Sequence, residues 1–498
     1  MLYTSTRDKS IRVESAQAIA HGISKEGGLF VPVEIPKISL NDIERLVNCS
    51  YIERAKEILS LYLTDFSEEE LDYCVNGAYA EGRFSDKKVA PLHTLDENTE
   101  VLELWKGPTC AFKDMALQLL PYLLTVASSK SAPDKEIVIL VATSGDTGKA
   151  ALEGFKDVPK TKILVFYPED GVSPMQKLQM TTQEGANVGV CAIEGNFDDA
   201  QSGVKKIFTD KAVADKLESM GMMFSSANSI NWGRLVPQIV YYVSAYCDML
   251  EKGRINLGDA INIVVPTGNF GNILAAYYAK EMGIPVKKLI CASNSNDVLT
   301  EFLSTGVYNR QRDFYTTISP SMDILISSNL ERLLFLLSDM NDTAVSGWMN
   351  DLSSKGTYQV DDEVFTKIKN LFEAGSCDDE GTKATISEIF KKHNYLCDTH
   401  TAVAVAVYDD YFHVTADGTP TVIASTANPF KFSASVLDAV HPGMTEGMDE
   451  FDMVLGLHVE TGAECPAQLA NLKDKAPRFT QCCKKEDMES VVFDMLSK

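Results

Sequence analysis

Lys113 is placed where a lysine can act as a nucleophile. It lies at the start of an amphipathic stretch in ELWKGPTCAFKDMALQLL, directly after a Gly-Pro turn and an apolar Ala-Phe pair. A helix N-terminus disfavours a cation, so the pKa of this amine should lie below the usual value of about 10.4. A neutral lysine amine can form a Schiff base with an aldehyde. A solvent-facing lysine paired with Asp114 explains the same residues, and on composition alone that interpretation is favoured.

The loop PTGNFGN, Pro266 to Asn272, separates the apolar run INIVV from the helical pattern ILAAYYAKEM. Its glycines let the backbone approach a ligand closely, and the helix start offers unpaired N–H groups. Such a loop suits a phosphate. Short glycine motifs also arise by chance, so an ordinary strand-to-helix turn stays equally open.

The segment TSGDTGK, Thr143 to Lys149, has the same strand–loop–helix setting. It is not a nucleotide P-loop, because the first glycine position holds Thr143 and Ala150 follows the lysine. Its hydroxyls and backbone N–H groups, those of Ser144 and Thr147 included, could hold a carboxylate. Simple helix capping by Thr143 or Ser144 accounts for the loop equally well.

These three features lie in one region of the chain. A reactive lysine, a carboxylate-type loop and a phosphate-type loop are what an enzyme needs to hold pyridoxal phosphate as a Schiff base and to bind an amino acid beside it.

The elements that must position these groups show a regular order. Five segments each place a β-branched apolar run before a loop and a helical pattern: 136–155, 161–180, 186–208, 221–246 and 261–283. Apolar strands without strict alternation, each followed by a helix, indicate a mostly parallel sheet covered on both faces. The sequence therefore predicts an α/β fold with its functional loops at the carboxyl ends of the strands.

The remaining segments do not alternate strands with helices. Residues 10–85 are mostly helical in pattern. Two amphipathic helices, NLERLLFLLSDM and EVFTKIKNLFEAG, indicate an inserted helical subdomain at about 305–395. We expect an N-terminal domain at 1–85, a catalytic α/β region at 86–440 that contains this insertion, and a C-terminal segment at 441–498.

Composition excludes several classes of protein. The 498 residues carry 46 Lys+Arg against 70 Asp+Glu, a net charge of −24, which argues against nucleic-acid binding. No apolar run approaches the roughly 18 residues of a membrane helix, and the N-terminus lacks a signal-peptide pattern. Eleven scattered cysteines indicate reduced thiols, and the histidines form no zinc-ligand motif. We expect a cytoplasmic protein without a metal, a nucleic-acid partner or a membrane partner.

Longer motifs resemble one known family. GPTCAFKDMALQ, ATSGDTGKAA, NSINWGRLVPQ, PTGNFGN and STANPFKF, in this order, resemble the threonine synthases of the bacterial and fungal type. YTSTRD, KEGGLFVP, SPSMDILISSNLERLLF and CDTHTAVAVAVY extend the resemblance over nearly the whole chain. It implies a pyridoxal-phosphate enzyme of fold type II, the tryptophan-synthase-β fold: mostly parallel sheets with flanking helices, a helical N-terminal domain and an inserted helical subdomain. It also implies a monomer.

The resemblance assigns roles by position. Lys113 would form the Schiff base with the cofactor, and Thr426 would hydrogen-bond its pyridine nitrogen. The residues that would line the cofactor phosphate are Gly268, Asn269, Phe270 and Asn272, with Gly271 permitting the turn. Those that would face the substrate carboxylate and the cofactor O3′ are Ser144, Asp146 and Thr147. Lys106 and Asn428 stand where many relatives have histidine, which bears on the substrate rather than on the cofactor.

The implied reaction converts O-phospho-L-homoserine and water to L-threonine and phosphate. Arg7, Lys177 and Arg234 are candidates for binding the substrate phosphate; a surface ion pair is the stronger interpretation for Lys177, and we assign Arg234 to the substrate. An alternative is a phospho-lyase or dehydratase that releases a 2-oxo acid and ammonia. A catalytically silent metabolite-binding relative is a third interpretation, although it predicts loss of the lysine or of the glycine loop.

Overall fold

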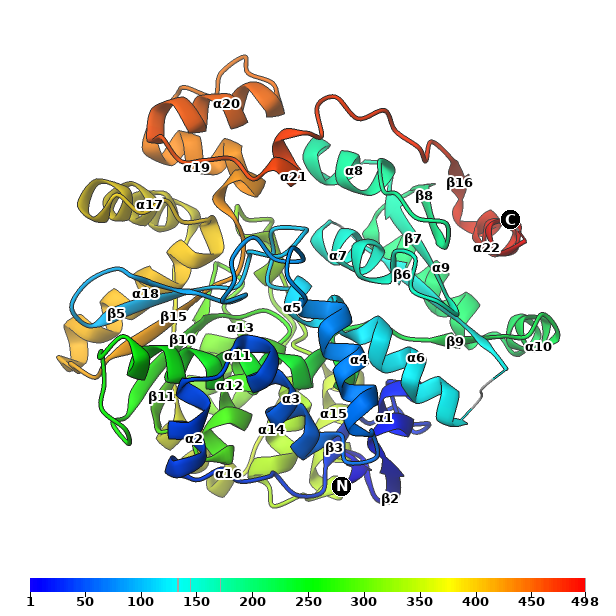
Figure 1. The fold of residues 1–498 in the computed structure, drawn as a ribbon, viewed down its shortest axis with the longest axis horizontal. Helices are drawn as coiled ribbons and strands as arrows, with labels where there is room; N and C mark the ends of the chain where they lie inside the picture. The colour runs from blue at the N-terminus through cyan, green and yellow to red at the C-terminus, as the bar shows by residue number, and fades with distance from the viewer. Residues whose placement is uncertain (132–133, 144, 171, 498) are drawn as a thin grey trace.

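Two mostly parallel β-sheets form the frame of the molecule (Figure 1). The computed structural model describes residues 1–131, 134–143, 145–170 and 172–497. The first sheet has the order β14-β11-β10-β15-β5-β4, and only β4 runs antiparallel to its neighbour. Its strands are β4 (Leu92–Thr94), β5 (Thr99–Glu103), β10 (Ile261–Pro266), β11 (Val286–Ser293), β14 (Phe372–Ser376) and β15 (Thr421–Ser425).

The second sheet is parallel throughout and has the order β16-β8-β7-β6-β9. Its strands are β6 (Glu136–Ala142), β7 (Thr161–Pro168), β8 (Val188–Glu194), β9 (Met222–Ser225) and β16 (Cys482–Lys484). The helices that follow the predicted strands are α7 (Asp146–Phe155), α8 (Pro174–Thr181), α9 (Phe197–Thr209), α11 (Trp232–Glu251) and α12 (Gly271–Met282). The predicted α/β fold with alternating strands and helices is confirmed.

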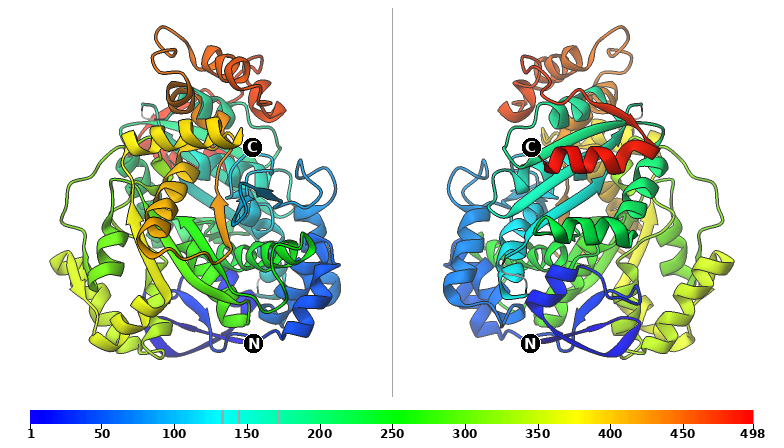
Figure 2. Two further views of the ribbon diagram at one scale, coloured as in Figure 1. Left: turned by 90° about the vertical axis from the view of Figure 1, so that its left-hand side faces the viewer. Right: turned by 90° about the vertical axis from the view of Figure 1, so that its right-hand side faces the viewer.

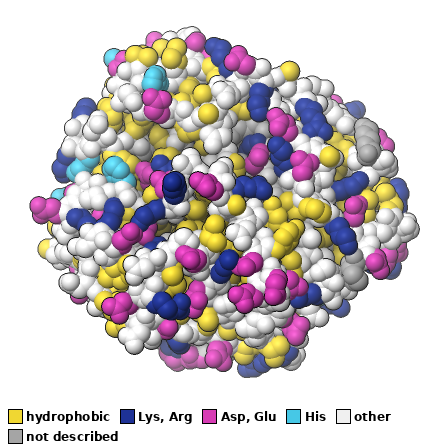
Figure 3. Space-filling model, viewed as in Figure 1, with side chains coloured by type: hydrophobic (Ala, Val, Ile, Leu, Met, Phe, Trp, Pro, Cys, Tyr) yellow, Lys and Arg dark blue, Asp and Glu magenta, His cyan; other side chains and the backbone are white. Residues whose placement is uncertain are grey.

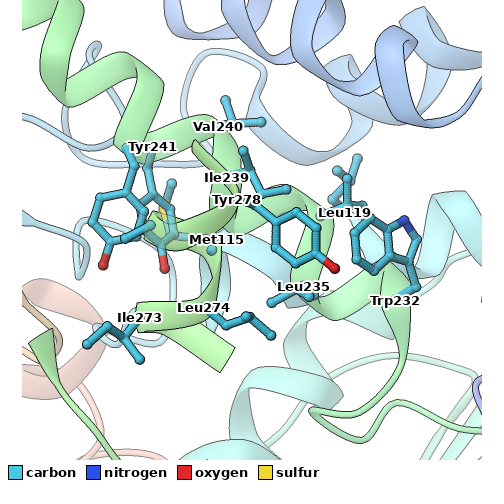
Figure 4. Packing of buried hydrophobic residues seen from close by; sticks show 14 of the residues in the cluster. Met115, Leu119, Trp232, Leu235, Ile239, Val240, Tyr241, Ile273, Leu274 and Tyr278 are labelled. Carbon is cyan, nitrogen blue, oxygen red and sulfur yellow. The ribbon is translucent and has the colours of Figure 1, made fainter. Parts of the chain in front are cut away.

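Helix α11 lies at the centre of the core. Its residues from Trp232 to Met249 are buried, as expected of a helix that is apolar on all sides. Figure 4 shows Trp232 of this helix beside Tyr278 of α12, and the centroids of these two rings are 5.4 Å apart. The Asn231 side chain caps the helix by accepting a hydrogen bond from the N–H of Gly233 (2.8 Å).

The N-terminal domain is helical, as predicted, but it also contains a sheet. Its helices are α1 (Ser15–His21), α2 (Leu40–Val47), α3 (Tyr51–Tyr62) and α4 (Glu68–Tyr79). Strands β1 (Leu2–Ser5), β2 (Asp8–Glu14) and β3 (Phe30–Pro32) form an antiparallel sheet of order β2-β1-β3. The sequence pattern did not predict this sheet, because its strands are short and β2 is mostly exposed rather than continuously apolar.

The region 305–395 is largely helical, as predicted, with one exception that matters for the first sheet. It contains α14 (Leu330–Leu337), α15 (Asp342–Lys355), α16 (Asp362–Leu371) and α17 (Asp379–His393). The residues FEAG, expected at the end of a helix, instead belong to β14, which pairs with β11 through Phe372 and Leu289. No turn residue separates α16 from β14, so the sequence gives no signal that the helix ends and a strand begins there.

The C-terminal segment passes from one sheet to the other (Figures 1 and 2). After α19 (Ser433–Val440) and α20 (Glu450–Thr461) the chain reaches β16 at the edge of the second sheet, and α22 (Met488–Leu496) packs beside α9. The domain boundaries at residues 85 and 440 stay predictions.

The surface charges and the helix lengths bear on nucleic-acid and membrane binding. Figure 3 shows Lys and Arg side chains interspersed with Asp and Glu over the face in view. Within the described ranges, no helix combines the length and the apolar character needed to cross a membrane.

Candidate active site

Three neighbouring strands of the first sheet end at the same edge. Strand β10 leads into the loop 267–270, β15 into Thr426, and β5 into the segment that carries Lys113. Because carboxyl ends of parallel strands share one edge, this order brings the three sequence-predicted groups together. Two contacts fix the arrangement: the N–H of Phe112 donates to the carbonyl O of Thr426 (2.8 Å), and the N–H of Asn428 donates to the carbonyl O of Cys110 (3.0 Å).

The loop after β10 forms a cradle of backbone amides. Phe270 adopts a left-handed conformation with φ of 63°, which turns the chain into α12. A Cβ atom at Gly268 would lie 2.5 Å from the carbonyl O of Ser321, so only glycine fits there. In the described part of the chain, the N–H groups of residues 268–272 donate to no acceptor. Free amides at a helix N-terminus are the donor set that an anionic phosphate needs.

Two asparagines of this loop play different parts. The buried Asn272 Oδ1 accepts a hydrogen bond from the Tyr241 hydroxyl (2.8 Å), whereas its Nδ2 finds no partner among the described residues. Asn269 has an exposed side chain, and its backbone O accepts a hydrogen bond from Asn329 Nδ2 (3.1 Å). Asn272 therefore has a free N–H donor, whereas the backbone of Asn269 holds the loop against Asn329.

Lys113 has a side-chain amine without a hydrogen-bond partner in the described residues. The lysine directly precedes the short helix α5 (Asp114–Leu117) and is partly exposed. Asp114 does not pair with it, because Thr109 donates both its N–H (2.8 Å) and its hydroxyl (2.6 Å) to that carboxylate. Burial lowers the pKa of Lys113; the charge of Asp146 opposes this shift, and the charges of Lys431 and Arg234 support it.

Thr426 lies at the carboxyl end of β15, between the lysine segment and the cradle. It is 6% exposed, and in the described structure its hydroxyl makes no hydrogen bond. A hydroxyl without a protein partner on a largely buried residue is available to a ligand.

Asp146 opens α7 from the second sheet and forms a buried ion pair. Its Oδ1 lies 2.8 Å from Lys431 Nζ and accepts a weaker hydrogen bond from Gln176 Nε2 (3.3 Å). Burial alone would raise the pKa of Asp146, but the charges of Lys431 and Lys113 more than offset this and hold it below its usual range. The carboxylate is therefore ionised and already paired.

The two threonine hydroxyls near Asp146 differ: one caps the helix, and the other has no partner in the described residues. Thr143 Oγ1 accepts hydrogen bonds from the N–H groups of Gly145 and Gly148, both at 3.0 Å, so Thr143 caps this helix. Thr147 is partly exposed, and its hydroxyl has no partner in the part of the chain that is described. Ser144 lies outside the described residues.

Arg234 is a buried guanidinium without a carboxylate. Within the described ranges it forms no ion pair; its Nη1 donates to the carbonyl O of Ala227 (2.6 Å), and its Nε has no partner. Burial lowers the pKa of Arg234 to about 10, and its charge acts on Lys113. A buried cation that lacks a counter-ion is a binding group for an anion.

The other candidate cations are engaged elsewhere. Arg7 makes a two-pronged contact with Glu331, Nε to Oε1 at 2.8 Å and Nη2 to Oε2 at 2.7 Å. Lys177 forms an ion pair with Glu169 (2.6 Å) at the surface, as expected for this residue from the sequence.

The two positions that differ from many relatives have local roles. Lys106 Nζ lies 2.9 Å from Glu103 Oε2 and above the Trp105 ring. Asn428 Oδ1 accepts a hydrogen bond from the N–H of Phe430 (3.0 Å) and so caps the turn that carries Lys431.

Sequence reasoning missed two residues of this site. Lys431 lies inside STANPFKF, where a lysine between two phenylalanines directly after a strand was the available signal. His400 is buried near the site; its Nδ1 lies 2.7 Å from Asp398 Oδ2, and its Nε2 accepts the N–H of Ser321 (3.1 Å). The Asp-Thr-His run at a helix start was the only sequence signal for it.

The donor set fits pyridoxal phosphate. The amide cradle at residues 268–272 suits its phosphate, the free amine of Lys113 suits its aldehyde, and the unbonded hydroxyl of Thr426 suits its ring nitrogen. Arg234, which has no carboxylate partner in the described structure, lies outside this set and leaves a cation for a second anion.

Comparisons with known proteins agree on one family. Three family profiles match: "Threonine synthase N terminus" over residues 2–79, "Pyridoxal-phosphate dependent enzyme" over 101–425, and "Threonine synthase, C-terminal" over 401–492. The human protein "Threonine synthase-like 1" is 41% identical over 85% of this chain and 58% of its own length, so the chain spans less than two thirds of that relative. The threonine synthase of Pseudomonas aeruginosa is 38% identical over 88% of this chain and 90% of its own.

Solved structures are similar over the full length. The structure of PLP-bound threonine synthase from Brucella melitensis has a TM-score of 0.89 and 36% identity, covering 99% of both chains. That of threonine synthase from yeast has a TM-score of 0.89 and 31% identity, covering 100% of this chain and 99% of that one.

Proposed function

Because this chain belongs to the threonine synthase family of pyridoxal-phosphate-dependent enzymes, we propose that it converts O-phospho-L-homoserine and water to L-threonine and phosphate. One observation carries the proposal. The segment that carries a lysine amine without a partner follows the same edge of the first sheet as a phosphate-type cradle and an unbonded threonine hydroxyl, and the charge of a buried guanidinium without a counter-ion acts on that amine. The site thus has separate groups for the phosphate of the cofactor and for that of the substrate.

We propose the following roles for individual residues, which this arrangement supports. Lys113 binds the aldehyde of the cofactor, and the amides of residues 268–272 bind its phosphate. Thr426 donates its hydroxyl to the ring nitrogen, which a hydroxyl leaves largely unprotonated. Asn272 supports the cradle and has a free Nδ2 donor.

The chain's own residues then handle the substrate. When bound, pyridoxal phosphate supplies a conjugated ring that acidifies the Cα–H bond of the amino acid. The Lys113 amine would accept the proton from Cα and pass it on within the site. As a neutral amine again, it would then accept a proton from Cβ while the phosphate leaves from Cγ. Water adds at Cβ, and Lys113 returns protons toward Cγ and Cα.

Two further sets of groups hold the ends of the substrate. Arg234 binds the leaving phosphate, because its guanidinium has N–H groups without acceptors and no carboxylate beside it. Thr147 and Ser144 bind the substrate carboxylate. Asp146, already paired with Lys431, acts on the site through its charge.

The setting of the enzyme is also part of this proposal. We place it in the cytoplasm, as a monomer with a small-molecule substrate, a Schiff base at Lys113 and no nucleic-acid partner. The scattered cysteines and the net charge of −24 support this setting.

The test compares the parent enzyme with Arg234→Ala. Loss of hydrogen bonds to a dianion should raise KM for O-phospho-L-homoserine roughly ten- to a hundredfold, while the visible absorbance of the bound cofactor stays unchanged. Lys177→Ala, which removes a surface ion pair, is the matched control and should leave KM unchanged. Loss of cofactor absorbance in Arg234→Ala would show that the arginine has a structural role instead.

A further inference from the structure

Both carboxylates near Lys113 are occupied by other groups. Thr109 holds Asp114 with two hydrogen bonds, and Lys431 holds Asp146 at 2.8 Å. As a result, no acid in the described structure forms an ion pair with Lys113. An amine without a carboxylate partner loses its proton more easily, and the neutral amine is the form that reacts with an aldehyde.

Lys431 is firmly fixed in its place. Its side chain is 1% exposed, and its Nζ donates to Asp146 Oδ1 and to the carbonyl O of Thr109 (2.9 Å). It belongs to the turn Pro429–Phe432 that follows β15 of the first sheet, whereas Asp146 opens α7 after β6 of the second. The ion pair therefore joins the loops of the two sheets beside the reactive lysine.

Removal of Lys431 would leave a buried carboxylate without its counter-ion. A buried charge in this state takes up another partner or a proton. Lys113 is the other nearby cation whose charge acts on Asp146. Pairing of Lys113 with Asp146 would keep its amine protonated and unreactive.

We propose that Lys431 is a positioning residue, which occupies the carboxylate of Asp146 and thereby leaves the amine of Lys113 free to react. The proposal rests on the proposed function in one respect, the identity of Lys113 as the cofactor lysine. The pKa of Lys113 supports it: burial lowers this pKa, Asp146 raises it and Lys431 lowers it. Reaction of the neutral amine with the aldehyde forms one C=N bond and releases one water, so no other reactant is needed.

The experiment measures how linkage to Lys113 depends on pH. The full-length chain, stripped of cofactor, is titrated with pyridoxal phosphate at a series of pH values, and the visible band of the lysine–cofactor linkage is recorded. For Lys431→Met we expect the pH midpoint of linkage to rise by about one unit or more, which lowers the reactive amine at neutral pH about tenfold. Lys431→Arg keeps the charge beside Asp146 and should stay close to the parent midpoint.

Two variants of Asp146 complete the test. The double variant Lys431→Met with Asp146→Asn should return the midpoint to the parent value or below it, because the competing carboxylate is gone. Asp146→Asn alone should move the midpoint down, and it carries the test if Lys431→Met does not fold. An unchanged midpoint in folded Lys431→Met would overturn the role of Lys431. If that variant does not fold, an unchanged midpoint in Asp146→Asn would overturn it, because the carboxylate would then have no effect for Lys431 to offset.

Lys113→Ala separates this proposal from the proposed function. Loss of the band in this variant, together with a shifted midpoint in Lys431→Met, supports both. A band that persists in Lys113→Ala overturns the assignment of the cofactor lysine, and with it the premise for Lys431. Loss of the band without any midpoint shift overturns the role of Lys431 alone.

Discussion

At Gly268 the chain leaves no room for a side chain, and this sets the shape of the amide cradle. In Gly268→Ala the new Cβ would meet the backbone carbonyl of Ser321 at 2.5 Å, which a rotamer change cannot relieve. We expect the loop to shift and the affinity for pyridoxal phosphate to fall at least tenfold, measured by titration of the cofactor-free chain.

Gly347→Ala is the matched control for this prediction. Gly347 lies in α15, and nothing stands within 4 Å of a Cβ built there. The substitution should leave cofactor affinity unchanged and stabilise the helix by up to about 1 kcal/mol. Parent-like cofactor affinity in Gly268→Ala would contradict the cradle.

Residues that act through a local motif could be predicted, whereas residues that act through a distant partner could not. Lys113 and the loop 266–272 stand out because helix starts and glycine turns have local sequence signals. The pairing of Asp146 with Lys431 has no such signal, since the two residues come from loops of different sheets. The roles assigned to all site residues, Lys113, Ser144 and Thr147 included, stay predictions.

At the scale of elements, the last helix packs against the second sheet. Met488, Val492 and Leu496 of α22 are buried in one apolar cluster with Val138 and Leu164 of strands β6 and β7. Lys162 Nζ also donates to the carbonyl O of Leu496 (2.8 Å). The C-terminal segment is thus part of the core on that side of the molecule.

A pair of valine substitutions tests this contribution. Val492 is 0% exposed, so Val492→Ala should lower the free energy of unfolding by about 2 kcal/mol. Val414 is 86% exposed, so Val414→Ala should change it by less than about 0.5 kcal/mol. Urea denaturation of both variants measures the difference. Equal effects would show that α22 does not pack as described.

Elements with strong periodicity were predictable, and short ones were not. The five strand–helix segments between 136 and 283 form as expected, because apolar runs and the helical period act over many residues. Strand β14 has five residues and follows α16 without a break, and its place is set by pairing with β11 rather than by its own sequence. The same holds for the short N-terminal strands, which depend on one another.

At the scale of the whole molecule, the site forms where loops of the two sheets meet. The first sheet supplies Lys113, Thr426 and the amide cradle, and the second supplies Asp146. Although the chain has a net charge of −24, Arg234 and Lys431 place positive charge near Lys113. A local excess of cations inside an acidic protein suits a phosphorylated, dianionic substrate.

The central claim is that Lys113 moves protons at Cα and Cβ of O-phospho-L-homoserine and that water then adds at Cβ. The most direct measurement is NMR analysis of the products after turnover in D₂O by the cofactor-loaded enzyme, with Lys113→Ala as the inactive control. We predict inorganic phosphate and L-threonine that carries solvent deuterium at Cα and at the methyl carbon. Release of a 2-oxo acid with ammonia, or threonine without deuterium at Cα, would contradict this account.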